Sequence, residues 1–135
     1  MHLEQSTQVN KILVVDDEVS MVQVCQLILQ ADGYHVRGAV NGRQALRMIA
    51  EDVPDFILLD IMMPGINGIE VCRLIRQEPL SPQPVIVMYT ADNRAEVREE
   101  SMAAGANGFV VKQNPFHDLP EKIAPYLGLN VTIAA

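Results

Sequence analysis

Short apolar runs rich in β-branched residues alternate along this chain with segments of helical periodicity, and this alternation limits the possible folds most strongly. The five runs lie at residues 11–15, 34–39, 55–60, 85–89 and 109–111. Such runs are typical of strands buried between two layers of helices. The alternation therefore predicts an α/β fold with a doubly wound, five-stranded parallel sheet and helices on both faces.

The segments between the runs carry signals for helices. The first helix, expected from residue 18 to 31, ends at Asp32-Gly33, a common helix stop. Its expected core stripe consists of Val19, Val22, Cys25 and Leu29. Further helices are expected at residues 42–50, from 68 to about 77, and up to 104. Asp92 or Asn93 is expected to cap the last of these three.

The chain has 135 residues, which fits one domain. We expect a flexible leader at residues 1–10, the domain at 11–127 and a tail at 128–135. The final helix should be short or bent, because Pro120 fits a first turn whereas Pro125 ends or kinks a helix.

Composition excludes several classes of protein. The net charge of −7 disfavours direct binding to a nucleic-acid backbone. No apolar run approaches the roughly 20 residues of a membrane span, and the polar start lacks the apolar core of a signal peptide. Cys25 and Cys72 lie in apolar stretches and are expected to be buried free thiols. These features predict a cytoplasmic protein without membrane contact.

Polar residues stand where the predicted strands end, and parallel strands bring those ends to one edge of the sheet. They are Asp16, Asp17, Asp60, Thr90, Ala91 and Lys112. Taken singly, each has a commoner explanation, such as a helix cap, a turn residue or a solvated lysine. Together they offer several carboxylates, one hydroxyl and one ammonium group at a single edge.

This set of groups favours phosphoryl chemistry. Clustered carboxylates repel one another, and Mg²⁺, which prefers oxygen ligands, relieves that repulsion. A carboxylate such as Asp60 can act as a nucleophile and form an aspartyl phosphate. Lys112 and the Thr90 hydroxyl would then bind phosphoryl oxygens, and the small Ala91 would leave room for one of them.

The same residues belong to longer motifs that resemble the receiver domain of bacterial two-component response regulators, the fold of the chemotaxis regulator. The motifs occupy residues 15–18, 59–68, 90–91 and 105–112, and the resemblance covers about residues 11–119. It implies a flavodoxin-like sheet of strand order 2-1-3-4-5. It also implies a signalling phosphoacceptor that catalyses only its own phosphorylation and dephosphorylation.

The resemblance assigns roles by position. Asp60 would accept the phosphoryl group from a histidine kinase or phosphotransfer protein. Mg²⁺ would be held by Asp17, Asp60 and the Met62 backbone carbonyl, with Asp16 acting mainly through water. Thr90 would be the switch hydroxyl, with Lys112 as partner of the phosphoryl group. Phe109 would be the aromatic switch residue, expected to turn inward in the activated form. The output would pass to a downstream effector protein, with a homodimer as a further possibility.

Three features depart from the family pattern or leave a choice open. The family lysine normally precedes a proline, often through a cis bond, whereas Lys112 is followed by Gln113 and Asn114 before Pro115. This predicts a longer loop with a trans link, and it leaves open how firmly Lys112 is anchored. The apolar side chain of Met62 cannot activate water, which predicts a long-lived phosphoryl group. The first helix also carries further apolar residues, which either crowd the core or form a docking face: Met21, Val24, Leu27 and Ile28.

Competing functions differ in the motifs they require. A phosphatase of the haloacid-dehalogenase kind needs Asp-x-Asp and a cap domain, whereas Asp16 and Asp17 are adjacent and the chain is too short for a cap. A dinucleotide-binding domain is excluded, because the first strand is not followed by a glycine-rich turn. A pseudo-receiver that binds partners without phosphorylation remains the alternative.

Overall fold

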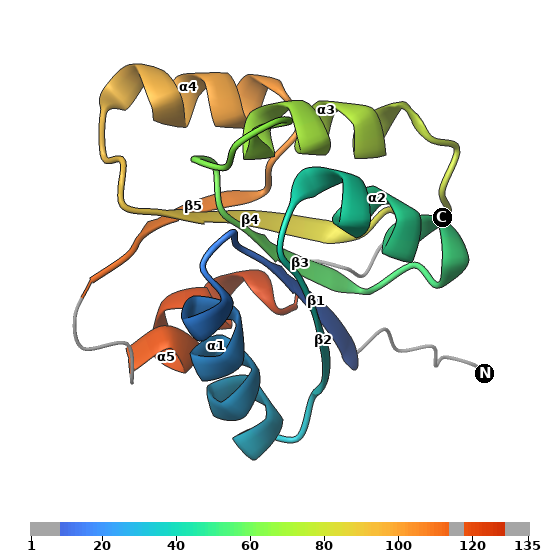
Figure 1. Cartoon of the computed structure of the whole chain (residues 1–135), viewed down its shortest axis with the longest axis vertical. Coiled ribbons are helices and arrows are strands. Elements are labelled where there is room, and N and C mark those ends of the chain that lie inside the picture. The colour runs from blue at the N-terminus through green and yellow to red at the C-terminus, as the bar shows by residue number, and fades with distance from the viewer. Residues whose placement is uncertain (1–8, 114–117, 129–135) are drawn as a thin grey trace.

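The computed structural model describes residues 9–113 and 118–128 and contains the predicted parallel sheet. The strand order is β2-β1-β3-β4-β5, and every neighbouring pair is parallel (Figure 1). The bounds of the strands are β1 Lys11–Val15, β2 His35–Ala39, β3 Phe56–Leu59, β4 Val85–Thr90 and β5 Gly108–Val111. The prediction of fold class and strand order is confirmed.

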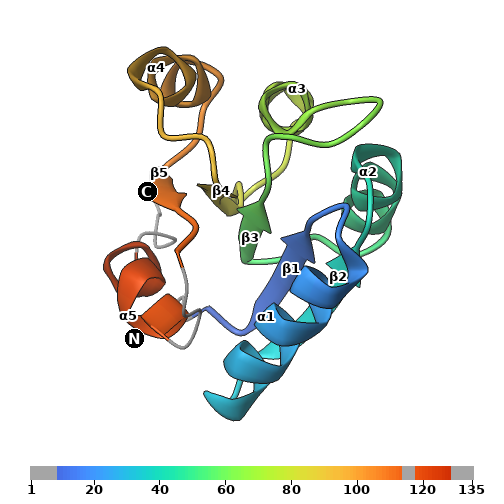
Figure 2. The same ribbon diagram turned by 60° about the vertical axis from the view of Figure 1, so that its left-hand side comes forward.

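Helices cover both faces of this sheet. The bounds are α1 Val19–Ala31, α2 Gly42–Glu51, α3 Gly68–Gln77, α4 Ala95–Ala103 and α5 Leu119–Ile123. Figure 2 shows α1 and α5 on one face and α2, α3 and α4 on the other. A short 3-10 helix, η2 (Ala124–Tyr126), follows α5 and contains Pro125, so the prediction of a short final helix is confirmed.

Two aliphatic cores lie above and below the sheet, because successive residues of a strand face opposite sides. In β3, Ile57 and Leu59 face the layer of α2, α3 and α4, whereas Phe56 and Leu58 face α1 and α5. All four side chains are at most 1% exposed. Burial of each contributes roughly 2 kcal/mol, which makes β3 the centre of the fold. Cys25 and Cys72 are buried free thiols, as predicted.

Two sequence predictions about helix ends are wrong. Val19, placed in the core stripe of α1, is 55% exposed, and Met21 is buried instead. The buried residues Met21, Val22, Cys25 and Leu29 define the face of α1 that packs on the sheet, and Val19 lies outside that face. The N-cap of α4 is Arg94, and neither Asp92 nor Asn93 caps the helix. Asp92 instead accepts a hydrogen bond from the Arg94 backbone N–H at 3.1 Å, which orders the turn before α4.

Candidate functional site

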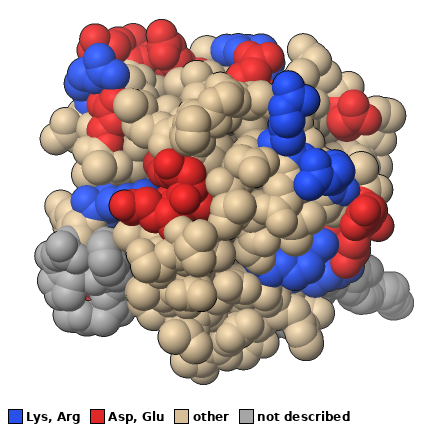
Figure 3. Space-filling model, viewed as in Figure 1, with Lys and Arg blue, Asp and Glu red and all other residues tan. Residues whose placement is uncertain are grey.

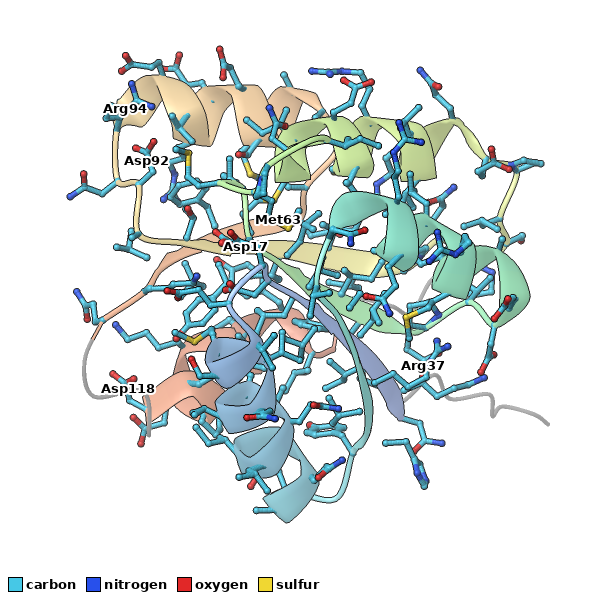
Figure 4. All side chains as sticks on the ribbon, viewed as in Figure 1. Asp17, Arg37, Met63, Asp92, Arg94 and Asp118 are labelled. Carbon is cyan, nitrogen blue, oxygen red and sulfur yellow. The ribbon has the colours of Figure 1, made fainter. Side chains whose placement is uncertain are left out.

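Three carboxylates meet at the carboxyl edge of the sheet. One oxygen each of Asp16, Asp17 and Asp60 lies within 4.8 Å of the other two. The neighbouring strands β1 and β3 bring them together, since the Asp60 N–H donates to the Val15 carbonyl at 2.9 Å and continues the ladder. Asp16 and Asp60 are buried, whereas Asp17 is exposed in the turn between β1 and α1 (Figure 4). The predicted convergence of these residues is thus present.

Lys112 supplies positive charge to this cluster. Its Nζ lies 2.5 Å from Asp16 Oδ2 and 3.3 Å from Asp60 Oδ2, and its side chain is 12% exposed. The Lys112 backbone N–H also donates to the Thr90 carbonyl at 2.8 Å. The anchoring of Lys112, which the sequence leaves open, is provided by contacts to two carboxylates and to β4. The predicted trans link to Pro115 falls outside the described residues.

Burial and charge act in opposite directions on the groups of the cluster. Burial raises the pKa of the Asp60 carboxyl, Lys112 opposes this rise and Asp16 adds to it. Burial lowers the pKa of Lys112, but the hydrogen bond to Asp16 and the two negative charges raise it overall. Lys112 therefore stays cationic, while an ionised Asp60 carries an uncompensated desolvation cost.

Thr90 and Phe109 share one face of the sheet beside this cluster. Thr90 is fully buried at the end of β4, and its Oγ1 accepts a 3.4 Å hydrogen bond from the Asp92 backbone N–H. Phe109 pairs with Met88, two residues before Thr90, and therefore faces the same layer of helices. Its ring is 6% exposed, with the Arg98 guanidinium 5.4 Å from the ring centroid. The ring is thus inward in this structure.

The loop after β3 forms the outer wall of the site. The Met62 side chain is 61% exposed, while its backbone hydrogen bond to Asp60 lowers the pKa of that carboxyl. Ala91 is exposed beside Thr90. Figure 3 shows a group of acidic side chains near the middle of this face, where Figure 4 labels Asp17 in the same view, and a second acidic group over α4. This edge is therefore open to a small charged ligand.

Gly68 is a site residue that sequence reasoning missed. A Cβ at this position would overlap the Asp60 carbonyl oxygen, and the Gly68 N–H donates to the Ile61 carbonyl at 3.0 Å. Glycine therefore lets the first turn of α3 lie against the backbone of the acidic cluster. The sequence showed Asn67-Gly68 as a helix start, but the close approach of β3 depends on tertiary structure.

The fold and the acidic edge define a class of protein: a flavodoxin-like domain with a carboxylate and lysine site at the ends of its parallel strands. Residues 12–124 match the family model of the response regulator receiver domain. The chain belongs to this family, the receiver domains of two-component systems.

Individual relatives agree with this assignment. The phosphate regulon transcriptional regulatory protein PhoB of Rhizobium meliloti is 39% identical over 114 residues, which cover 84% of this chain and 49% of PhoB. Chemotaxis protein CheY4 of Vibrio cholerae superposes with a TM-score of 0.82 at 32% identity, covering 88% of this chain and 99% of CheY4. Response regulator protein TrrA of Thermotoga maritima, solved in complex with Mg²⁺ and BeF, superposes with a TM-score of 0.75 at 37% identity. The match covers 87% of this chain and 99% of TrrA.

PhoB and the response regulator PleD of Caulobacter vibrioides are longer proteins than this chain. The matched part of this chain corresponds to 49% of the length of PhoB and to 22% of that of PleD. None of the helices in the described residues is long and apolar enough to cross a membrane.

Proposed function

We propose that this domain accepts a phosphoryl group on Asp60 from a phosphohistidine of a histidine kinase or phosphotransfer protein, and then changes its surface for a partner. One observation carries the proposal: the buried Asp60 has the Nζ of Lys112 3.3 Å from its Oδ2, and one of its oxygens lies within 4.8 Å of oxygens of Asp16 and Asp17. An acidic nucleophile with a cation and acidic neighbours suits reversible phosphorylation. The pseudo-receiver alternative gains no support from this geometry.

The donor set fits a divalent cation. Three carboxylates face the single positive charge of Lys112, and burial already disfavours ionisation of Asp60. Asp17, Asp60 and the Met62 backbone carbonyl would hold Mg²⁺, and Asp16 would act mainly through water. When bound, the ion would neutralise charge on the phosphoryl oxygens.

The chemistry of transfer can be assigned to the chain's own groups. One carboxylate oxygen of Asp60 bonds to phosphorus while the P–N bond of the donor breaks, and the electron pair remains on the imidazole nitrogen, which takes up a proton. The Lys112 ammonium and the Thr90 hydroxyl would bind phosphoryl oxygens, with room provided by Ala91. These groups are already at the strand ends, so transfer needs little rearrangement.

The same geometry suggests the switch. Movement of Thr90 toward the phosphoryl group would leave space on the face that it shares with Phe109. Because Phe109 is already buried beneath Arg98, phosphorylation would stabilise an arrangement that the domain can adopt without it. The surface of α4 and β5 would then carry the signal.

The output is proposed to pass through a partner protein or a homodimer. Relatives such as PhoB are named transcriptional regulators, but the match covers only part of each. The net charge of −7 argues against direct nucleic-acid binding by this domain.

Incubation with phosphoramidate and Mg²⁺, followed by intact-mass measurement, tests the proposed function. We expect a gain of one phosphoryl group, removed by hydroxylamine and absent when the metal is chelated. An unchanged mass in Mg²⁺ would favour the pseudo-receiver alternative.

A docking face for the phosphodonor is proposed on α1. Three of its apolar side chains are exposed: Val19 at 55%, Val24 at 36% and Leu27 at 69%. Met21 is buried, so some of the additional apolar residues of this helix pack in the core and others are exposed at the surface. The exposed residues begin beside Asp17, where a donor histidine would have to approach.

The substitution Val24→Glu is expected to slow phosphotransfer from a cognate histidine kinase about tenfold, because it places a charge in an apolar contact. Phosphorylation by phosphoramidate, which needs no docking, should be unchanged. Gln30→Glu, on the exposed far end of α1, is the control. Equal rates for Val24→Glu and wild type with the kinase would remove α1 from the docking face.

The substitution Met62→Asn is expected to shorten the lifetime of the phosphorylated domain several-fold, because a polar amide can orient water toward phosphorus whereas the thioether cannot. The measurement is loss of the phosphoryl mass after removal of phosphoramidate. Met62→Leu is the matched control and should leave the lifetime unchanged. An equal lifetime for Met62→Asn would show that Met62 does not set it.

A further inference from the structure

A buried aromatic ring lies beside the cationic group of the site. Lys112 Nζ is 5.8 Å from the centroid of the Tyr89 ring, and the ammonium lies over the ring. Tyr89 is the penultimate residue of β4 and is 5% exposed. This distance is within the range at which a ring face attracts a cation.

The sheet register explains how the two side chains meet. Tyr89 pairs with Val110 of β5, and both belong to the core that faces α1 and α5. Lys112 stands two residues after Val110, so its side chain leaves the backbone toward the same face. The Lys112 N–H bond to the Thr90 carbonyl, at 2.8 Å, holds the two chain segments together at this point.

We propose that Tyr89 is a positioning residue for Lys112, its ring face holding the ammonium in place for phosphoryl binding. The inference rests on the proposed function. In this structure Lys112 is also held by Asp16 at 2.5 Å and Asp60 at 3.3 Å. Both carboxylates would gain new partners if a cation bound or if Asp60 were phosphorylated. The ring of Tyr89 keeps its charge distribution through both events.

A positioning contact of this kind is needed because of the chemistry of the lysine side chain. An ammonium on a flexible four-carbon stem has many rotamers, and only a few direct it between two carboxylates. A ring face attracts the cation without adding negative charge to the cluster. Burial raises the pKa of Tyr89, and Cys25, Asp118 and Asp16 raise it further. The tyrosine therefore remains neutral beside Lys112.

The test compares Tyr89→Leu with Tyr89→Phe, each alone and together with Lys112→Met. The readout is the rate of phosphorylation by phosphoramidate at saturating Mg²⁺. Tyr89→Leu should be about three- to tenfold slower than wild type, whereas Tyr89→Phe, which keeps the ring, should retain the rate. In the Lys112→Met background, Tyr89→Leu should cause no further loss. Equal slowing in both backgrounds, or equal slowing by Leu and Phe, would overturn the proposal.

A second readout does not depend on phosphorylation. The Hε protons of Lys112, observed by NMR, should be shifted by the aromatic ring in wild type and Tyr89→Phe, and unshifted in Tyr89→Leu. The same spectra show whether each variant is folded. A failure of wild type to be phosphorylated would reject the proposed function, while unchanged Lys112 protons in Tyr89→Leu would reject the contact itself.

Discussion

Replacing Asp60 by Asn is expected to abolish phosphorylation by phosphoramidate while the domain stays folded. An amide oxygen does not form the acyl phosphate, and the neighbouring Asp16 is bonded to Lys112 at 2.5 Å. The measurement is intact mass after incubation with Mg²⁺. Asp32→Asn, an exposed position at the far end of α1, is the control and should gain one phosphoryl group. Incorporation by Asp60→Asn would place the acceptor on another residue.

The same variant has an expected effect on stability. Burial raises the pKa of Asp60 in the folded state above its unfolded value. The contribution of Asp60 to the free energy of unfolding is therefore fully present below the unfolded pKa and is lost as the pH rises through the folded pKa. Asp60→Asn should therefore raise the free energy of unfolding by about 1 kcal/mol at neutral pH without metal. The gain should vanish near pH 4, where the wild-type carboxyl is protonated. A loss of stability at neutral pH would mean that the attraction of Lys112 outweighs burial.

Much of the architecture was predictable because strand and helix periods are local. Each predicted strand is present, with bounds that differ by at most one residue at either end, since apolar runs of this kind have few alternative conformations. The errors occur where a local signal competes with tertiary position. Val19 is apolar and correctly spaced, but the buried face of α1 runs through Met21, Val22 and Cys25 and leaves Val19 exposed. Asp92 is a good capping residue, but its carboxylate also pairs with the Arg94 side chain at 2.7 Å.

The site was predictable to the extent that it depends on strand ends. Asp16, Asp60 and Lys112 converge because parallel strands finish at one edge, which the order of residues already implies. The roles of Gly68 and Tyr89 could not be found in this way. Both depend on contacts between chain segments, the backbone approach at Asp60 and the register of β4 with β5. Neither contact leaves a local sequence pattern.

The substitution Lys112→Met is expected to destabilise the domain by about 3 kcal/mol at neutral pH, because it keeps the side-chain stem and removes the charge between two buried carboxylates. Asp16 and Asp60, whose side chains are 3% and 7% exposed, would be left without their cationic partner. The loss should diminish toward pH 4, because burial raises the pKa of Asp60 and this carboxyl group takes up a proton as the pH falls. Urea unfolding at the two pH values measures both effects.

Magnesium separates this electrostatic account from a simple packing defect. If the carboxylates bind the ion, it stabilises the folded state by mass action, and Lys112→Met should gain more stability from Mg²⁺ than wild type, where Lys112 competes for the same oxygens.

Phosphorylation by phosphoramidate should nevertheless fall about a hundredfold, since the variant lacks a cation aimed at the phosphoryl oxygens. Lys122→Met is the matched control: Lys122 lies 3.9 Å from Asp118 at the surface, and its loss should change stability by less than about 0.5 kcal/mol. A Lys112→Met variant as stable as Lys122→Met would show that Lys112 does not compensate the acidic cluster.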